Sequence, residues 1–232
     1  MHDPVREPPC CNLLTDYSTG EFRDRSWKQE VGTLVGDATD STGKLDLDGS
    51  GDYLDLTASA DYSPGESGVD TPFTIVGNWT NDNSGGWGIL CSKRNVTTGV
   101  QDWLIDAQSA AGARIQTSFY MPTSAGNRIV NQSSPIVWSA GMEQIAVTYD
   151  GSGSHTGIEN YRNAAVLSGA KSMTGTYTGG TNTAAVLRIG GWFYPAVPRA
   201  FNGKEHGMLC IEKREWPLIE LQVWHQTSIN QL

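Results

Sequence analysis

Hydrophobic and polar residues alternate along most of this chain. In 45–48 two leucines alternate with aspartates, and in 53–56 two leucines alternate with a tyrosine and an aspartate. Because side chains of a β-strand point alternately to its two faces, this alternation predicts strands with one buried face. The same pattern recurs at 73–78, 115–119, 145–149, 187–189 and 207–211.

Glycine-rich turns separate these segments, as in the Asp-Gly-Ser-Gly sequences at 48–51 and 150–153. Glycine supplies the positive φ angles that tight hairpins need. Many strands joined by short connections predict an all-β fold, either a sandwich or a barrel.

The two ends of the chain differ from the strand region. Residues 1–26 hold three prolines and show little periodicity, which predicts an extended N-terminal arm before a β-sandwich of residues 27–232. One short helix is predicted after Pro217, because proline suits a first helical turn. The apolar residues expected on one side of this helix are Leu218, Leu221 and Trp224.

Composition indicates a folded, acidic protein. Of the 232 residues 38% are hydrophobic and 18% charged, and 16 Lys and Arg against 25 Asp and Glu give a net charge of −9. A chain of this charge lacks the basic face that nucleic acid or an anionic membrane requires. The first residues lack the apolar region of a secretory signal, so we expect a product made in the cytoplasm.

Four cysteines occur, at positions 10, 11, 91 and 210. Their spacing matches neither a zinc ribbon nor a redox Cys-x-x-Cys motif, and adjacent cysteines are poorly placed to bridge each other. We therefore expect all four to be reduced thiols.

Several strand-and-turn motifs follow one another in a fixed order. They are 45–56 (LDLDGSGDYLDL), 72–75 (PFTI), 89–93 (ILCSK), 144–151 (QIAVTYDG), 158–164 (IENYRNA), 187–191 (LRIGG), 201–203 (FNG) and 208–211 (MLCI). Taken in order, they resemble the laminin-G-like or concanavalin-A-like lectin/glucanase domain. The resemblance covers about residues 30–225 and implies an antiparallel two-sheet jelly-roll sandwich.

Some members of that superfold are glycosidases, whose two carboxylates flank the scissile bond. Their Glu-x-Asp-x-x-Glu strand motif is absent from this sequence. The nearest acid pairs are Asp46 with Asp48 and Asp52 with Asp55, all in the opening hairpin segment. The four histidines show no metal-ligand spacing, and other catalytic motifs are missing. We therefore expect a protein that is not an enzyme.

The resemblance also implies that a calcium ion can bind at the rim of the sandwich. Weak candidate ligands are Asp48, Asp52 and Glu205, which carry oxygen donors suited to a hard cation. Lys204 beside Glu205 weakens a site there, and simple solvation of these acids is the plainer alternative. No other cofactor is expected.

Aromatic residues supply the best contact site in the sequence. Trp192, Phe193 and Tyr194 are consecutive, so they cannot all face one side of an extended chain. At least one is expected to contact a subunit or a glycan, with local loop packing as the alternative. Trp87, within the glycine-rich segment 85–88, is a second candidate.

Two functions from different classes fit these observations. The first is a non-enzymatic virion structural protein, as in laminin-G-like modules of phage particles: a capsid decoration, cement or tail-associated module, made in the host cytoplasm. Its partners would be neighbouring virion or capsid subunits, held as an oligomer through the arm. The alternative is a soluble carbohydrate-binding lectin, with or without calcium, that binds a cell-surface glycan in adhesion outside the cell. A glycosidase with a divergent carboxylate pair is the third hypothesis.

Overall fold

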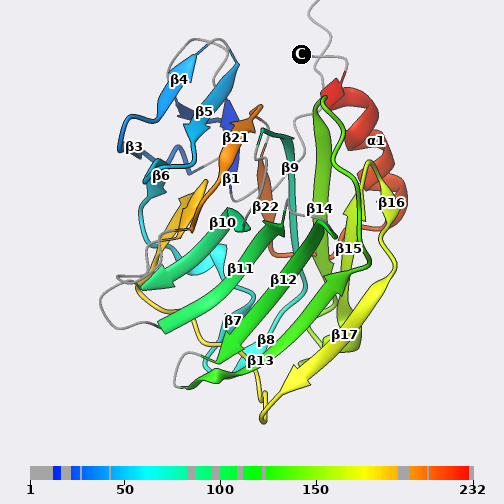
Figure 1. Cartoon of the computed structure of the whole chain (residues 1–232). Helices are drawn as coiled ribbons and strands as arrows, with labels where there is room; N and C mark the ends of the chain where they lie inside the picture. Colours follow the sequence, from blue (N-terminus) through cyan, green and yellow to red (C-terminus); the bar gives the residue numbers. More distant parts are fainter. Residues whose placement is uncertain are drawn as a thin grey trace, which may run out of the picture.

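Two large antiparallel sheets face each other in the computed structural model (Figure 1). The structure describes residues 13–16, 22–26, 28–41, 43–82, 87–95, 100–108, 112–121, 124–192, 199–207 and 209–229. The first sheet has the order β16 (Ala165–Val166), β15 (Ile158–Arg162), β14 (Glu143–Tyr149), β9 (Phe73–Asn81), β21 (Asn202–Glu205), β5 (Lys44–Asp48) and β4 (Thr39–Ser41). It also includes β22 (Cys210–Glu212), β1 (Leu13–Asp16) and β2 (Arg23–Asp24).

The second sheet lies across the core from the first. Its order is β17 (Gly169–Thr174), β13 (Ser124–Ser133), β12 (Arg114–Met121), β11 (Val100–Gln108), β10 (Trp87–Asn95), β18 (Val186–Ile189), β6 (Tyr53–Leu56) and β3 (Gly32–Val35). Among the described residues there are also two small strand pairs: β7 (Gly65–Glu66) with β8 (Val69–Asp70), and β19 (Gly191–Trp192) with β20 (Arg199–Ala200). Short 3-10 turns occupy Ala60–Tyr62 and His155–Gly157. The all-β two-sheet sandwich predicted from the sequence is confirmed.

The main core lies between the two sheets. The leucines of β5 and β6 are buried while the residues between them are partly exposed, as their alternation predicts. Aromatic side chains join the sheets: Phe119 of β12 stacks on Tyr149 of β14 with ring centroids 4.8 Å apart. Offset ring pairs of this kind add about 0.5–1.5 kcal/mol to the gain from burial alone.

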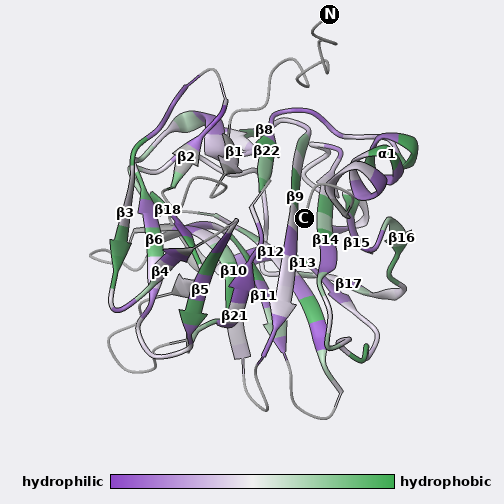
Figure 2. Cartoon of the chain, turned by 90° about the horizontal axis from the view of Figure 1, so that it is seen from above, coloured by the Kyte–Doolittle hydropathy of each residue, from purple (hydrophilic) through white to green (hydrophobic). Residues whose placement is uncertain are grey.

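Helix α1 (Leu218–Ile229) covers part of the outer face of the first sheet, beside β14, β15 and β16 in both Figure 1 and Figure 2. For this reason β14 is buried along its whole length, rather than on one face as the alternation predicts. A second core forms beneath the helix, where Val76 and Ala146 meet Leu221 and Trp224. The short C-terminal helix is thus confirmed, and two of its three expected inward residues are buried.

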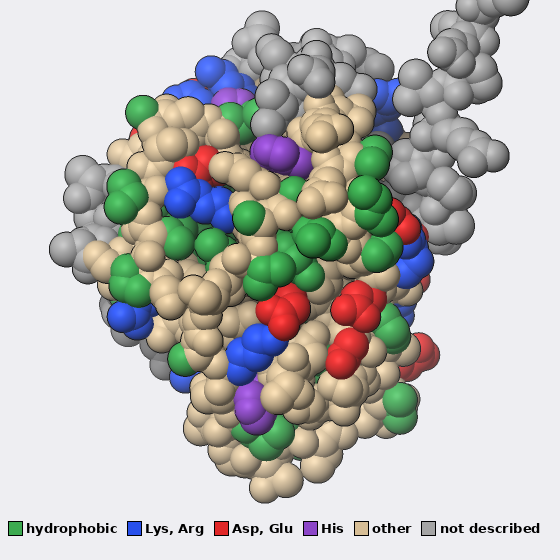
Figure 3. All heavy atoms as spheres, turned by 90° about the vertical axis from the view of Figure 1, so that its right-hand side faces the viewer, with side chains coloured by type: hydrophobic (Ala, Val, Ile, Leu, Met, Phe, Trp, Pro, Cys, Tyr) green, Lys and Arg blue, Asp and Glu red, His purple; other side chains and the backbone are tan. Residues whose placement is uncertain are grey.

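Leu218, the third residue expected on the inner side of the helix, is instead 41% exposed. It lies in the first turn, ahead of the part of the helix that contacts the sheet. Ile219 and Val223 are 63% and 57% exposed, so the outer side of α1 carries apolar residues beside exposed Gln222 and Gln226. Figure 3 shows hydrophobic side chains among polar ones on this face of the molecule.

Part of the predicted arm is a strand of the sandwich. β1 pairs antiparallel with β22, and Thr15 is fully buried. The backbone N–H of Thr15 donates to the carbonyl of Leu209 at 3.1 Å, and the N–H of Leu209 donates to the Thr15 hydroxyl at 2.8 Å. Residues 13–16 of the predicted arm therefore form a strand of the sandwich, because β22 offers an edge with which this segment pairs. Residues 1–12 lie outside the described residues.

The cysteines differ from the prediction in one respect. Cys91 is a free, buried thiol, whereas Cys210 is disulfide-bonded. The expectation that all four are reduced is therefore wrong. It failed because sequence spacing carries no information on which strands meet in space. No helix in the described part of the chain is long and apolar enough to cross a bilayer.

Candidate functional site

The aromatic segment predicted as a contact site is only partly within the described residues. The backbone of Trp192 pairs with Arg199 in β19 and β20. Phe193 and Tyr194 lie outside the described residues. Trp87 begins β10 opposite Gln108, and its side chain is half-buried. The contact role of these residues stays a prediction.

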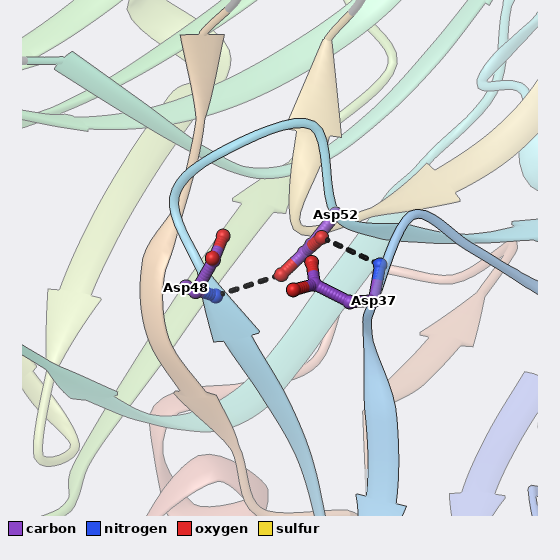
Figure 4. Close-up of side chains that lie close together, drawn as sticks. All are labelled: Asp37, Asp48 and Asp52. Carbon is purple, nitrogen blue, oxygen red and sulfur yellow. Dashed lines mark hydrogen bonds between the residues drawn. The ribbon is translucent and has the colours of Figure 1, made fainter.

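Two of the three predicted metal ligands come together. Asp48 and Asp52 flank the β5–β6 turn, and Asp37, after β3, joins them with carboxylate oxygens within 4.8 Å (Figure 4). Glu205 is elsewhere, fully buried on β21 opposite Leu45. The sequence analysis missed Asp37 because it reaches the cluster only through the pairing of β3 with β6.

Asp52 is the centre of this acidic cluster. Its carboxylate accepts the backbone N–H of Asp37 at 3.1 Å and that of Asp48 at 2.9 Å. Burial opposes ionisation of Asp52, but these hydrogen bonds outweigh it and hold its pKa below the ordinary value. The side-chain hydrogen bond with Asp52 raises the pKa of Asp37. Asp52 therefore ties two turns of the sandwich together.

A glycine makes this approach of the two turns feasible. Gly36 has a φ of +80°, and a Cβ at this position would lie 2.5 Å from an oxygen of Asp52. A calcium ion takes six to eight oxygen ligands. Both Asp52 oxygens already accept backbone N–H groups. These contacts explain the cluster as a turn anchor, in which the Asp52 side chain holds two turns together. Calcium binding stays a prediction.

The acid pairs considered for glycosidase chemistry are also engaged in other contacts. Asp55 receives two hydrogen bonds from the guanidinium of Arg188, at 2.6 and 2.8 Å. Asp46 lies 3.7 Å from the ammonium of Lys204. These contacts suit ion pairs along the strands.

An open pocket of about 460 Å³ lies beside the start of the described chain. Its lining residues are Phe22, Asp24, Arg25, Gln29, Glu30, Val31 and Gly32. The pocket thus combines an aromatic ring, a short apolar surface and several polar side chains. Sequence analysis missed it, because Phe22 and Arg25 fall in the segment predicted as an arm.

Hydrogen bonds fix the loop that carries the pocket. The carboxylate of Asp24 accepts the N–H of Ser26 at 2.8 Å and the N–H of Glu30 at 2.9 Å. The N–H of Phe22 donates to Asp40 at 2.7 Å. The Phe22 ring also packs against Gly32, where an added Cβ would lie 2.8 Å from a ring carbon. The aromatic ring is therefore held in place before any ligand arrives.

The polar side chains of the pocket offer both donors and acceptors. Arg25 and Gln29 are exposed, and Gln29 has a φ of +50°. The carboxylate of Glu30 accepts the hydroxyl of Thr57. An aromatic ring beside such groups is the usual composition of a small-molecule site.

Comparisons with known proteins identify solved structures with a similar fold. No family model and no curated protein matches the chain. Among solved structures, the botulinum neurotoxin serotype G binding domain matches with a TM-score of 0.66 and 14% identity, over 94% of this chain and 51% of that one. A structure of botulinum neurotoxin type C, a toxin whose cell entry depends on interaction with two ganglioside molecules, matches with a TM-score of 0.68 and 10% identity, over 94% of this chain and 51% of that one.

A third match is the serotype D ligand-binding domain in complex with N-acetylneuraminic acid. Its TM-score is 0.65 at 10% identity, over 95% of this chain and 51% of that one. The chain thus has the β-sandwich architecture of these receptor-binding domains and spans about half of their length. At such low identity the matches establish the fold alone. Membership of the laminin-G-like or concanavalin-A-like family stays a prediction.

Proposed function

We propose that this chain is a non-enzymatic, glycan-binding β-sandwich module. The observation that carries the proposal is the pocket at Phe22, where a fixed aromatic ring lies beside exposed polar side chains. The apolar C–H face of a sugar ring would pack on Phe22, and its hydroxyl groups would bond to Gln29 and Glu30. Rigidity of the loop favours binding, because little conformational entropy is lost.

Arg25 gives the pocket a preference among glycans. The pocket lining holds the Arg25 guanidinium beside the carboxylates of Asp24 and Glu30. These two carboxylates already accept hydrogen bonds from Ser26 and Thr57, respectively. Guanidinium groups bind carboxylates through charge-assisted hydrogen bonds. A sugar with a carboxylate, such as a sialic acid, would therefore bind more tightly than a neutral sugar. Two of the structural neighbours, a ganglioside-dependent toxin and a complex with N-acetylneuraminic acid, support this class of ligand.

A location outside the cell suits this function. Disulfides persist in oxidising compartments and are rare in the cytosol, and Cys210 is disulfide-bonded. The virion role predicted from the sequence depends on the arm, residues 1–26, and on residues 192–194. Residues 1–12 and 17–21 of the arm, and the side chains of 192–194, lie outside the described residues. That role stays a prediction.

The test is glycan-array screening followed by calorimetry with the best-bound glycan. Phe22→Leu keeps an apolar side chain but removes the aromatic face, so we expect affinity to fall about three- to tenfold, or about 0.5–1.5 kcal/mol. Arg25→Ala should weaken binding of acidic glycans about ten- to 100-fold, as expected for loss of a charged hydrogen bond.

Two variants outside the pocket serve as controls. Val137→Ala, at a residue 82% exposed, should change nothing. Trp192→Ala tests the site predicted from sequence. If Trp192→Ala abolishes binding while Phe22→Leu and Arg25→Ala do not, the pocket is the wrong site. If the folded protein binds no glycan on the array, the proposed function is wrong.

A further inference from the structure

Lys93 is a charged residue buried inside the sandwich. It lies on β10 and is 0% exposed, among the largest fully buried side chains. Its ammonium nitrogen contacts three oxygens: Oδ2 of Asp102 at 2.7 Å, Oδ1 of Asn182 at 2.7 Å and the carbonyl of Thr183 at 2.8 Å. Burial lowers the pKa of Lys93, while the neighbouring charge of Asp102 acts in the opposite direction. Attack on a carbonyl carbon requires the neutral amine, so Asp102 must first take a proton from the ammonium.

A β-bulge aims the carboxylate of Asp102 at this amine. In the ladder between β10 and β11, Lys93 lies opposite Trp103 and Arg94 opposite Gln101, so Asp102 is the extra residue. Bulges of this type re-aim a side chain and are common next to reactive sites. One carboxylate oxygen of Asp102 receives Lys93, while the other is buried with no hydrogen-bond partner among the described residues. The second carboxylate oxygen of Asp102 can therefore accept a proton.

Asn182 brings a side-chain amide to the same point. It lies in the segment before β18, which pairs with β10, and its carbonyl oxygen accepts the hydrogen bond from Lys93. Since a carbonyl bond is about 1.23 Å long, Nζ lies within about 3.9 Å of the amide carbon. The Ser63 hydroxyl is 3.4 Å from the same carbonyl oxygen and 2.7 Å from Asp102. An amine, an amide carbon and an acid–base carboxylate thus meet in one cluster, in which Lys93 and Asp102 are buried and Asn182 is exposed.

We propose that Lys93 and Asn182 form an autocatalytic crosslink, an isopeptide bond between the lysine Nζ and the amide carbon of Asn182. Asp102 first takes a proton from the ammonium, and the free amine attacks the amide carbon. The Nζ–Cγ bond forms, and the Cγ–Nδ2 bond breaks after Asp102 returns a proton to the departing nitrogen. The leaving nitrogen departs as ammonia and takes up the remaining proton as ammonium. Nothing is oxidised or reduced, and no other reactant is consumed.

The surroundings suit each step. Lys93 and Asp102 are shielded from water, which strengthens the electrostatic attraction between the carboxylate and the protons of the Lys93 ammonium. Asn182 is exposed on its other side, so ammonia can leave toward solvent. The Ser63 hydroxyl is placed to donate to the amide oxygen as negative charge develops there. The crosslink would close a loop of 89 residues and tie β10 to the segment that precedes β18.

The experiment is intact-protein mass spectrometry of the full chain after complete reduction of disulfides. Loss of ammonia lowers the mass by about 17 Da relative to the sequence mass. A cyclised asparagine gives the same loss, so tandem mass spectra must also show one branched peptide that joins Lys93 to Asn182. A full sequence mass for the folded protein, or a loss without that branched peptide, overturns the proposal.

Variants at the exposed end of the cluster keep the test independent of folding. Asn182→Ala removes the amide carbon, so it should retain the full mass. Thr181→Ala, a matched change one residue earlier in the same segment, should still show the loss. Asn182→Asp should react more slowly and lose water, about 18 Da. If Asn182→Ala shows the same loss as the wild type, the modification lies elsewhere and the proposal is wrong.

Discussion

Replacing Asp52 by alanine tests the interpretation of the acidic cluster as a turn anchor. Asp52 is 1% exposed, and its carboxylate accepts two backbone N–H groups. Its loss would leave both donors without their acceptor. A fully buried donor left unsatisfied costs about 1–3 kcal/mol, and these two donors are only partly buried, so we expect the free energy of unfolding to fall by about 2–4 kcal/mol in total.

Urea unfolding followed by tryptophan fluorescence measures this change. Asp37→Asn is the matched control, because its backbone N–H still donates to Asp52 while one of three close negative charges is removed. This variant should be as stable as the wild type or more so. Both curves should be taken with calcium and with a chelator. If Asp37→Asn destabilises the protein only when calcium is present, the cluster is a metal site and the anchor interpretation is refuted.

The same cluster predicts a dependence on pH. The pKa of Asp52 is below its ordinary value in the folded state, so its contribution to stability is present above the unfolded pKa of about 3.9. That contribution is lost as pH falls from this value through the folded pKa. Wild type and Asp52→Ala should therefore approach each other in stability under acid conditions. A constant difference across this range would contradict the argument.

Two further predictions follow from the disulfide and from a buried ion pair. Without reductant, the denatured chain should expose two thiols to Ellman's reagent rather than four, because Cys210 is disulfide-bonded and Cys91 is free; four thiols would show that no disulfide forms. Arg162→Ala should lower the free energy of unfolding by about 3 kcal/mol, because it leaves the fully buried carboxylate of Glu143 without the guanidinium 2.5 Å away. The control is Arg128→Ala, whose guanidinium contacts the Tyr120 hydroxyl at 3.4 Å and the Tyr120 ring but no buried carboxylate among its described contacts. Equal effects in the two variants would refute the argument.

The strands and helix α1 were predictable because alternation and turn residues are local signals. The leucines of 45–48 and 53–56 show this directly, since each is buried as its position in the pattern requires. The full burial of β14 was not predictable, because the cover comes from a helix about 70 residues later in the chain.

The candidate sites also depend on contacts between distant segments, which the sequence does not reveal. Asp48 and Asp52 were found because one turn connects them, whereas Asp37 arrives through strand pairing. Lys93 and Asp102 had no special signal, since each sits in an ordinary strand pattern. Only the bulge in the ladder and the approach of Asn182 from a distant segment give these residues a shared chemistry.

The pairing of β1 with β22 constrains how the protein folds as it is synthesised. The hydrogen bond between Leu209 and Thr15 spans 194 residues. Strand β1 therefore cannot form this pairing until β22, near the other end of the domain, has been synthesised. Contacts so distant in sequence slow folding, and an unpaired strand edge promotes association of incomplete chains. The nascent chain therefore carries an open edge on its first sheet throughout most of translation. Production of this domain should depend on chaperones that cover that edge until the C-terminal strands emerge.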